Sequence, residues 1–189
     1  MQKAFIRLLL VATLLLNIIN CADQTAPLAD AEPGHLKYYF EYGDKYQSTI
    51  NDLESKRLAA DIQRKLSNAD VQALRGGSTI LLIGNVATSV DIVVAKSLAV
   101  NKYSDDNIIN KLAVDSLRSN TQVNQDNNIT SKTSHLIAKY KLKQLKYCCF
   151  NNEVFIVYPK NIDSSKITIL VQELKKNNKT LNSVQTFAY

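Results

Sequence analysis

The chain carries one sequence pattern twice, at a spacing of 74 residues. Residues 78–86 read STILLIGNV and residues 152–160 read NEVFIVYPK, and each run is followed by a polar break, a helix-like segment and a late apolar strand. Solenoid repeats are roughly 20–50 residues long, so a unit of this length has the size of a small domain. The 189-residue chain is therefore predicted to hold two copies of one module.

An export segment is predicted at residues 1–20. Lys3 and Arg7 make its start basic, and residues 8–19 are apolar apart from Thr13 and Asn17. A basic start followed by a short apolar core is typical of a secretory signal peptide. The core falls short of the about 20 apolar residues that span a bilayer. An uncleaved N-terminal anchor is the alternative interpretation.

Cys21 directly follows the apolar core and resembles the cysteine of a bacterial lipobox, which becomes lipidated. Asn20 departs from that pattern, because a small residue is usual before the cysteine. A cut after the A-x-A site at residues 29–31 is the alternative. We expect lipidation of Cys21, with residues 21–49 as a lipid-anchored tether, which would hold the protein on a membrane face without spanning the bilayer.

The first module is predicted at residues 50–115 with the element order α-β-β-α-β. Apolar residues at helical spacing predict the helices, and continuous apolar runs bounded by turn residues predict the strands. The elements are expected as a helix at 50–66, a weak strand at 71–75, a turn at Gly76 and Gly77, a strand at 79–86, a helix capped by Thr88 or Ser89, and a strand at 107–114. The second helix is expected to bury Val90, Val93, Val94, Leu98 and Val100.

A polar linker is predicted at residues 116–128, before a second module at residues 129–189. Its elements are expected as a helix at 129–140, strands at 145–150 and 154–158, a helix capped by Asp163 or Ser164, and a strand at 181–189 whose Val184 and Phe187 correspond to Ile109 and Leu112. A crossover helix makes the last strand parallel to its neighbour. The expected fold class is α+β, an α/β sandwich in which each module is a three-stranded mixed sheet with two helices on one face.

Charge is distributed unevenly along the chain. Residues 22–117 carry 10 Lys and Arg against 13 Asp and Glu, whereas residues 118–189 carry 11 against 4. A basic half attached to an acidic half predicts that the second copy meets an anionic partner. A solvated, lysine-rich surface without a partner is the alternative.

The element order and a few positions resemble a BON domain. The apolar-x-Gly-x-Val strand end of that family is present as residues 83–86, with Gly84 as the expected structural turn. Residues 153–156 and 183–187 make the second copy similar to the second domain of the dual BON-domain outer-membrane lipoproteins. One departure is that Tyr158 and Pro159 stand where the second copy should have its glycine.

This resemblance implies a non-catalytic protein at the periplasmic face of the outer membrane. BON domains are binding modules, and in the lipoproteins the second domain is implicated in binding anionic phospholipid and in supporting outer-membrane integrity. The implied binding residues lie around the two helices of the second module. They are Lys139, Tyr140, Lys141, Lys143, Lys146, Lys166, Lys175, Lys176 and Lys179.

The sequence carries no motif that points to catalysis. A P-loop, a dinucleotide fingerprint, a nucleophile elbow and a zinc-protease helix are all absent, and His35 and His135 stand apart from other ligand residues. We therefore expect no metal, no cofactor and no small-molecule substrate. Nucleic acid is disfavoured as a partner because the predicted export signal sends the chain out of the cytoplasm.

Two interpretations remain open. A scaffold subunit of an envelope assembly, or of a secretin-like secretion complex, would use small α/β modules of this kind to bind protein partners. Cys148 and Cys149 adjoin on a predicted strand, so their side chains should point to opposite faces. One is expected in the core, and an exposed partner would be able to form an intermolecular disulfide in an oxidising compartment.

Overall fold

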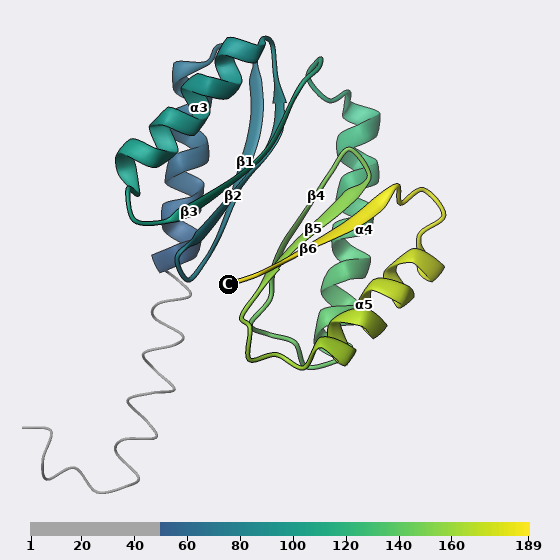
Figure 1. The fold of residues 1–189 in the computed structure, drawn as a ribbon. Coiled ribbons are helices and arrows are strands. Elements are labelled where there is room, and N and C mark those ends of the chain that lie inside the picture. The colour runs from purple at the N-terminus through teal and green to yellow at the C-terminus, as the bar shows by residue number, and fades with distance from the viewer. Residues whose placement is uncertain (1–49) are drawn as a thin grey trace, which may run out of the picture. The chain divides into compact units, whose positions relative to one another are not determined.

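The computed structural model describes residues 50–189 of the chain (Figure 1). These residues belong to one compact unit. The predicted signal peptide, the predicted lipid anchor at Cys21 and most of the predicted tether lie outside the described residues.

The first module has the predicted order of elements. A helix described from residue 50 to residue 65 precedes β1 (Ala69–Gly76) and β2 (Thr79–Val86), which are followed by α3 (Ser89–Lys102) and β3 (Asn107–Val114). The strands form one sheet in the order β1-β2-β3, in which β1 is antiparallel to β2 and β3 is parallel to β2. The central strand and the crossover helix therefore lie where the sequence predicted them.

The second module repeats this arrangement. Its elements are α4 (Asn120–Lys139), β4 (Lys146–Phe150), β5 (Glu153–Tyr158), α5 (Ser164–Asn177) and β6 (Ser183–Ala188). The sheet order is β4-β5-β6, again with one antiparallel and one parallel contact. The α+β fold class, with a three-stranded mixed sheet in each module, is confirmed.

The strand register tests the proposed equivalence of the two copies. The first hairpin closes with Gly76 opposite Thr79, and the second closes with Phe150 opposite Glu153, which confirms the spacing of 74 residues. The last strands differ from the prediction. Ile108 lies beside Ile80 and Val184 lies beside Val154, so Val184 corresponds to Ile108 and not to Ile109.

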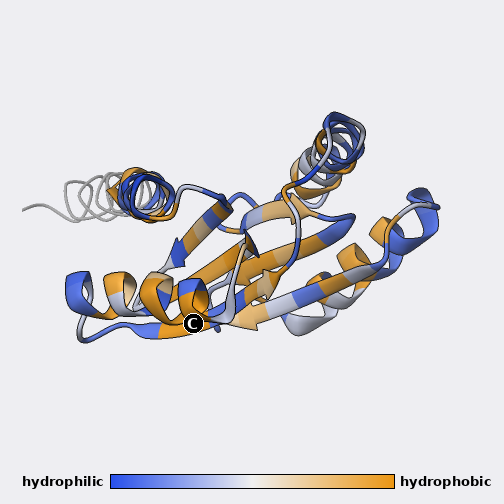
Figure 2. Cartoon of the chain, turned by 90° about the horizontal axis from the view of Figure 1, so that it is seen from above, coloured by the Kyte–Doolittle hydropathy of each residue, from blue (hydrophilic) through white to orange (hydrophobic). Residues whose placement is uncertain are grey.

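Each sheet is covered by helices on one face only (Figure 1). Alternate residues of β2 explain this: Ile80, Leu82 and Val86 pack with the helix at 50–65 and with α3, while Leu81 and Ile83 point to the other face. In β5, Val154 and Ile156 pack with α4 and α5 in the same way. Apolar residues accordingly concentrate in the strands of both sheets (Figure 2).

The predicted linker at residues 116–128 is largely helical. Helix α4 begins at Asn120 instead of residue 129, because Ser119 caps it. The Ser119 hydroxyl accepts a hydrogen bond from the Gln122 backbone, and the Gln122 side chain accepts one from the Ser119 backbone, which is a capping box. The connection between the modules is therefore only the short segment between β3 and α4.

The buried face of α3 also differs from the prediction. Ala95 and Ala99 are the buried residues of this helix, and Val94 and Leu98 are partly buried. Val90 and Val93 are 66% and 62% exposed, and Val100 is exposed as well. Small alanines allow the helix to lie close to the sheet, and this turns the larger valines toward solvent.

Gly84 is not a turn residue, as the sequence analysis expected. It lies inside β2 opposite Val71 and has a φ of +148°. A Cβ atom at this position would lie 2.1 Å from the Asp70 carbonyl oxygen, so the glycine permits a close approach of two backbones. The hairpin turn itself is Gly77 and Ser78, one residue later than predicted.

Candidate functional site

The two sheets contact each other through the faces that their helices leave open. Leu81, Ile83, Phe150, Phe155 and Val157 form a buried cluster between the sheets. The repeat spacing makes Leu81 equivalent to Phe155, and Ile83 equivalent to Val157. The modules therefore pack through equivalent surfaces, as two subunits do across an isologous interface.

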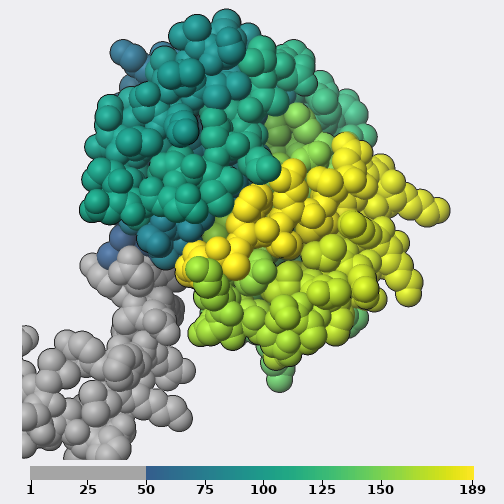
Figure 3. Space-filling view, in the orientation of Figure 1, coloured from purple at the N-terminus to yellow at the C-terminus, as the bar shows by residue number. Residues whose placement is uncertain are grey.

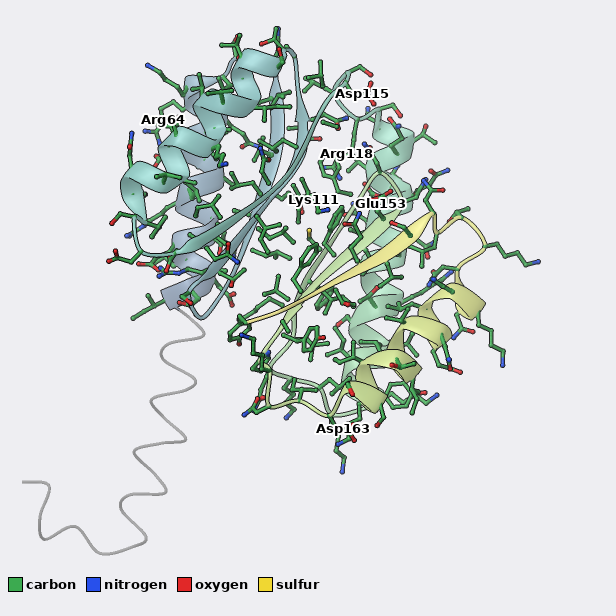
Figure 4. The ribbon with its side chains drawn as sticks, viewed as in Figure 1. Arg64, Lys111, Asp115, Arg118, Glu153 and Asp163 are labelled. Carbon is green, nitrogen blue, oxygen red and sulfur yellow. The ribbon has the colours of Figure 1, made fainter. Side chains whose placement is uncertain are left out.

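A buried cluster of charges joins the modules next to their connection. Arg118 is 8% exposed and donates from Nε and Nη2 to both carboxylate oxygens of Asp70 on β1, at 2.7 and 3.0 Å. Its Nη1 donates to Asp126 on α4 at 2.7 Å, and its guanidinium lies 3.8 Å from the centre of the Phe150 ring. Figure 4 shows Arg118 in this position. We call Arg118, Asp70 and Asp126 the Arg118 cluster.

The electrostatics of this cluster favour the charged guanidinium. Burial acts to lower the pKa of Arg118, but the hydrogen bonds from Asp70 and Asp126 outweigh it and raise the pKa above its ordinary value. Asp126 is almost fully buried and also accepts hydrogen bonds from the backbone N–H groups of Asn151 and Asn152, at 3.0 and 2.7 Å. The cluster thus connects β1, α4 and the β4–β5 turn.

The sheets are also connected at their opposite end. The Lys146 ammonium lies 2.8 Å from the Asp52 carboxylate, which joins the start of β4 to the helix at 50–65. The Tyr189 ring covers Gly76 and Gly77, where a Cβ atom would lie 2.4 or 2.6 Å from ring atoms. Figure 3 shows the C-terminal residues, in yellow, against the first module.

The candidate lysines fall at two ends of the second module. Two loops form one end, which we call the loop end: residues 140–145 between α4 and β4, and residues 159–163 between β5 and α5. The other end, which we call the turn end, comprises the β4–β5 turn and residues 178–182 between α5 and β6. Lys141, Lys143 and Lys166 are exposed at or next to the loop end, and Lys175, Lys176 and Lys179 are exposed at or next to the turn end.

Three residues of the predicted set are already engaged within the protein. Lys146 forms the ion pair with Asp52, Lys139 lies 3.7 Å from the Glu173 carboxylate, and Tyr140 is half-buried against the module core. The interaction with Tyr140, followed by that with Glu173, raises the pKa of Lys139. The predicted residues are thus not one continuous site.

Sequence reasoning missed Lys160, which is exposed at the loop end. Its backbone N–H donates to the Tyr189 carbonyl, which places it beside the end of β6. The signal that identifies it is structural, because Lys160 is distant in sequence from Lys141 and Lys143. Ile169, on the second turn of α5, is 43% exposed and adds an apolar side chain near these lysines.

The charge of the first module is more balanced than the prediction suggested. Residues 50–115 carry 8 Lys and Arg against 8 Asp and Glu, so the acidic excess lies in residues 22–49. Several of these charges pair with each other: Arg75 contacts Glu54 and Asp106, and Lys102 contacts Asp61. The contrast is therefore between a neutral first module and a basic second one.

The two cysteines of β4 lie on opposite faces, as predicted. Cys149 is buried with the helices of the second module, and Cys148 packs between the sheets. Burial raises the pKa of the Cys148 thiol to about 12, and burial with the nearby Asp126 carboxylate raises that of Cys149. Neither side chain is exposed, so the expected intermolecular disulfide has no accessible thiol on this strand.

Residues 50–189 show few features of a small-molecule site. Within them, no group of three or more His, Cys, Asp or Glu side chains is placed to hold a metal ion. A shallow, open depression is lined by Asn68, Ala87, Val114, Asp115, Ser116 and Leu117. In this part of the chain, no helix combines the length and the apolar character needed to cross a bilayer.

Comparison with known proteins yields only distant likenesses. No family model and no curated protein matches the chain. Two solved structures of CdsD, a structural protein of the type III secretion system of Chlamydia trachomatis, are similar at 14% identity and a TM-score of 0.31. The alignments cover 70% of this chain and 65% or 61% of those chains, so this chain spans less than two thirds of either structure.

Proposed function

We propose that the chain is an exported, non-catalytic protein of two BON-like modules that binds anionic phospholipid through its second module. On this proposal it acts at the periplasmic face of the outer membrane and supports the integrity of that membrane. The observation that carries the proposal is the charge contrast: residues 118–189 have 11 Lys and Arg against 4 Asp and Glu, whereas residues 50–115 are balanced.

The physical reason is electrostatic attraction between exposed lysines and lipid headgroups. Each Lys or Arg close to an anionic membrane surface contributes about 1 kcal/mol, and salt weakens this contribution. Lys141, Lys143 and Lys160 project into solvent on this module. Long lysine side chains can also lay their methylene groups along the surface while the ammonium reaches the phosphate.

The first module has a positioning role in this proposal. It is joined to the second module through the apolar cluster between the sheets and through the Arg118 cluster. When the second module binds lipid, the first is held in a defined orientation relative to the membrane. Its own surfaces then remain available to proteins of the envelope.

Binding to vesicles tests the proposal. We expect the whole chain to sediment with vesicles that contain phosphatidylglycerol and to remain in solution with vesicles of phosphatidylcholine alone, because only the former attract lysines. Co-sedimentation at matched lipid concentration measures the difference. Equal binding to both kinds of vesicle would contradict the electrostatic proposal.

Lipidation of Cys21 is part of the same proposal. The predicted signal peptide and the lipobox-like position of Cys21 support it. We expect the intact mass of protein extracted from membranes to fit a chain that begins at Cys21 and carries a diacylglyceryl group. An unmodified N-terminus at Glu32, after the A-x-A site, would contradict the anchor and leave lipid binding by the second module as a separate question.

A scaffold function is the second candidate, and the exposed valines of α3 favour it. Val90, Val93 and Val100 follow each other at helical spacing, so they form one apolar stripe on the outer surface. Apolar stripes of this kind occur where proteins associate. Light scattering after size-exclusion chromatography distinguishes the candidates, since large stable oligomers would favour the scaffold and a monomer the lipid-binding protein.

A further inference from the structure

We infer that the loop end of the second module faces the lipid surface, and that the turn end faces away from it. This inference rests on the proposed function and adds an orientation to it. The lipid contacts are then Lys141, Lys143, Lys160 and Lys166, and the lysines at the end of α5 are not required. The partner is a bilayer surface that carries anionic headgroups.

The strand register brings the two loops together. Lys146, at the start of β4, lies opposite Val157 near the end of β5. Adjacent strands are about 4.8 Å apart, so the loop that precedes Lys146 and the loop that follows Tyr158 leave the sheet at the same edge. Lys141 and Lys143 come from the first loop and Lys160 comes from the second. Lys166 is in the first turn of α5, which starts directly after it.

The lysines at the other end of α5 are far from this surface. A helix of 14 residues is about 21 Å long, so Lys176 lies most of that length away from Lys166. The Asn182 backbone N–H donates to the Asn152 carbonyl at 2.8 Å, which places the loop after α5 beside the β4–β5 turn. One flat membrane is thus unable to contact the lysines of both ends through the ends themselves.

The entry of the chain into the described unit favours the loop end. Asp52, in the first turn described for the helix at 50–65, forms the ion pair with Lys146. Residue 50 therefore lies on the same side of the unit as the loop end, and the predicted lipid anchor precedes it in sequence. The connection between the modules lies at the opposite side, where the Arg118 cluster meets the β4–β5 turn. A lipid-attached N-terminal segment would accordingly enter the unit from the membrane side.

The acidic groups near the loop end leave its lysines in excess. The Asp163 carboxylate accepts the backbone N–H of Ser165 and caps α5, and this bond lowers the pKa of Asp163, so it stays charged. The carboxylate of Tyr189 also lies here, beside Lys160, and Asp52 is engaged by Lys146. Four exposed lysines remain against Asp163 and the Tyr189 carboxylate. Figure 4 shows Asp163 at this end of the module.

Two triple variants with the same change in net charge test the orientation. The first carries K141E, K143E and K160E at the loop end, and the second carries K175E, K176E and K179E at or next to the turn end. All six lysines are exposed, so both variants should unfold at the wild-type temperature. A third variant with K141Q, K143Q and K160Q removes the charges without reversing them.

Dissociation constants for phosphatidylglycerol-containing vesicles separate the outcomes. We expect the loop-end variant to bind more than about tenfold more weakly than wild type, the glutamine variant to fall between them, and the turn-end variant to stay within about threefold of wild type. Wild type that binds while both charge-reversed variants lose equal affinity, or the turn-end variant loses more, would overturn the orientation alone. Wild type that ignores anionic vesicles would overturn the proposed function itself.

Discussion

Replacing Arg118 by alanine is expected to lower the free energy of unfolding by about 3–5 kcal/mol. The substitution removes three hydrogen bonds and leaves the carboxylates of Asp70 and Asp126 without their cation. Asp126 is 3% exposed, so its charge is separated from water and gains little solvation in exchange. The stacking of the guanidinium on the Phe150 ring is lost as well.

Chemical denaturation measures this effect, with Lys143→Ala as the matched control. Lys143 is exposed on the same module, and its truncation is expected to change stability by less than about 0.5 kcal/mol. Arg118→Lys should fall between the two, because an ammonium keeps the charge but is unable to bond both oxygens of Asp70 in the planar geometry of arginine. A loss below about 1 kcal/mol for Arg118→Ala would show that the cluster is not what joins the modules.

Replacing Gly84 by alanine is expected to have a comparable or larger effect. The new Cβ would lie 2.1 Å from the Asp70 carbonyl oxygen and 2.8 Å from the Val71 Cα, so β1 and β2 would have to separate. The φ of +148° is in addition a backbone conformation that alanine rarely adopts. Since β2 is buried along its whole length, this separation would disturb both faces of the first sheet.

The matched control for this change is Gly76→Ala on the neighbouring strand. There the new Cβ meets the side chains of Tyr189 and Val157, and the terminal tyrosine ring is able to turn aside. Thermal unfolding and the yield of soluble protein should rank wild type first, Gly76→Ala second and Gly84→Ala last. Equal behaviour of the two alanine variants would contradict the close approach at Gly84.

The central strands could be predicted from the sequence because they are apolar on both faces. In β2 and β5 the continuous apolar runs already indicated that each face is covered. What covers the second face, the sheet of the other module, leaves no local signal. The start of α4 was missed for a related reason: its first turns are polar, and the burial of Asp126 depends on partners far away in the sequence.

The candidate site was predictable in composition but not in arrangement. The charge count identified the basic module, whereas register and helix length decide which lysines share an end. Lys146 looked like the other lysines, yet its ammonium is paired with Asp52, 94 residues earlier in the chain. Arg118 had no visible role in the sequence because Asp70 is 48 residues away.

The salt dependence of binding to phosphatidylglycerol vesicles tests the central claim most directly. If exposed lysines of the second module hold the protein on an anionic surface, the dissociation constant should rise steadily as sodium chloride increases from low to physiological concentration, because the Debye length shortens to about 8 Å. An affinity that does not change with salt, or that is the same for neutral vesicles, would contradict the account.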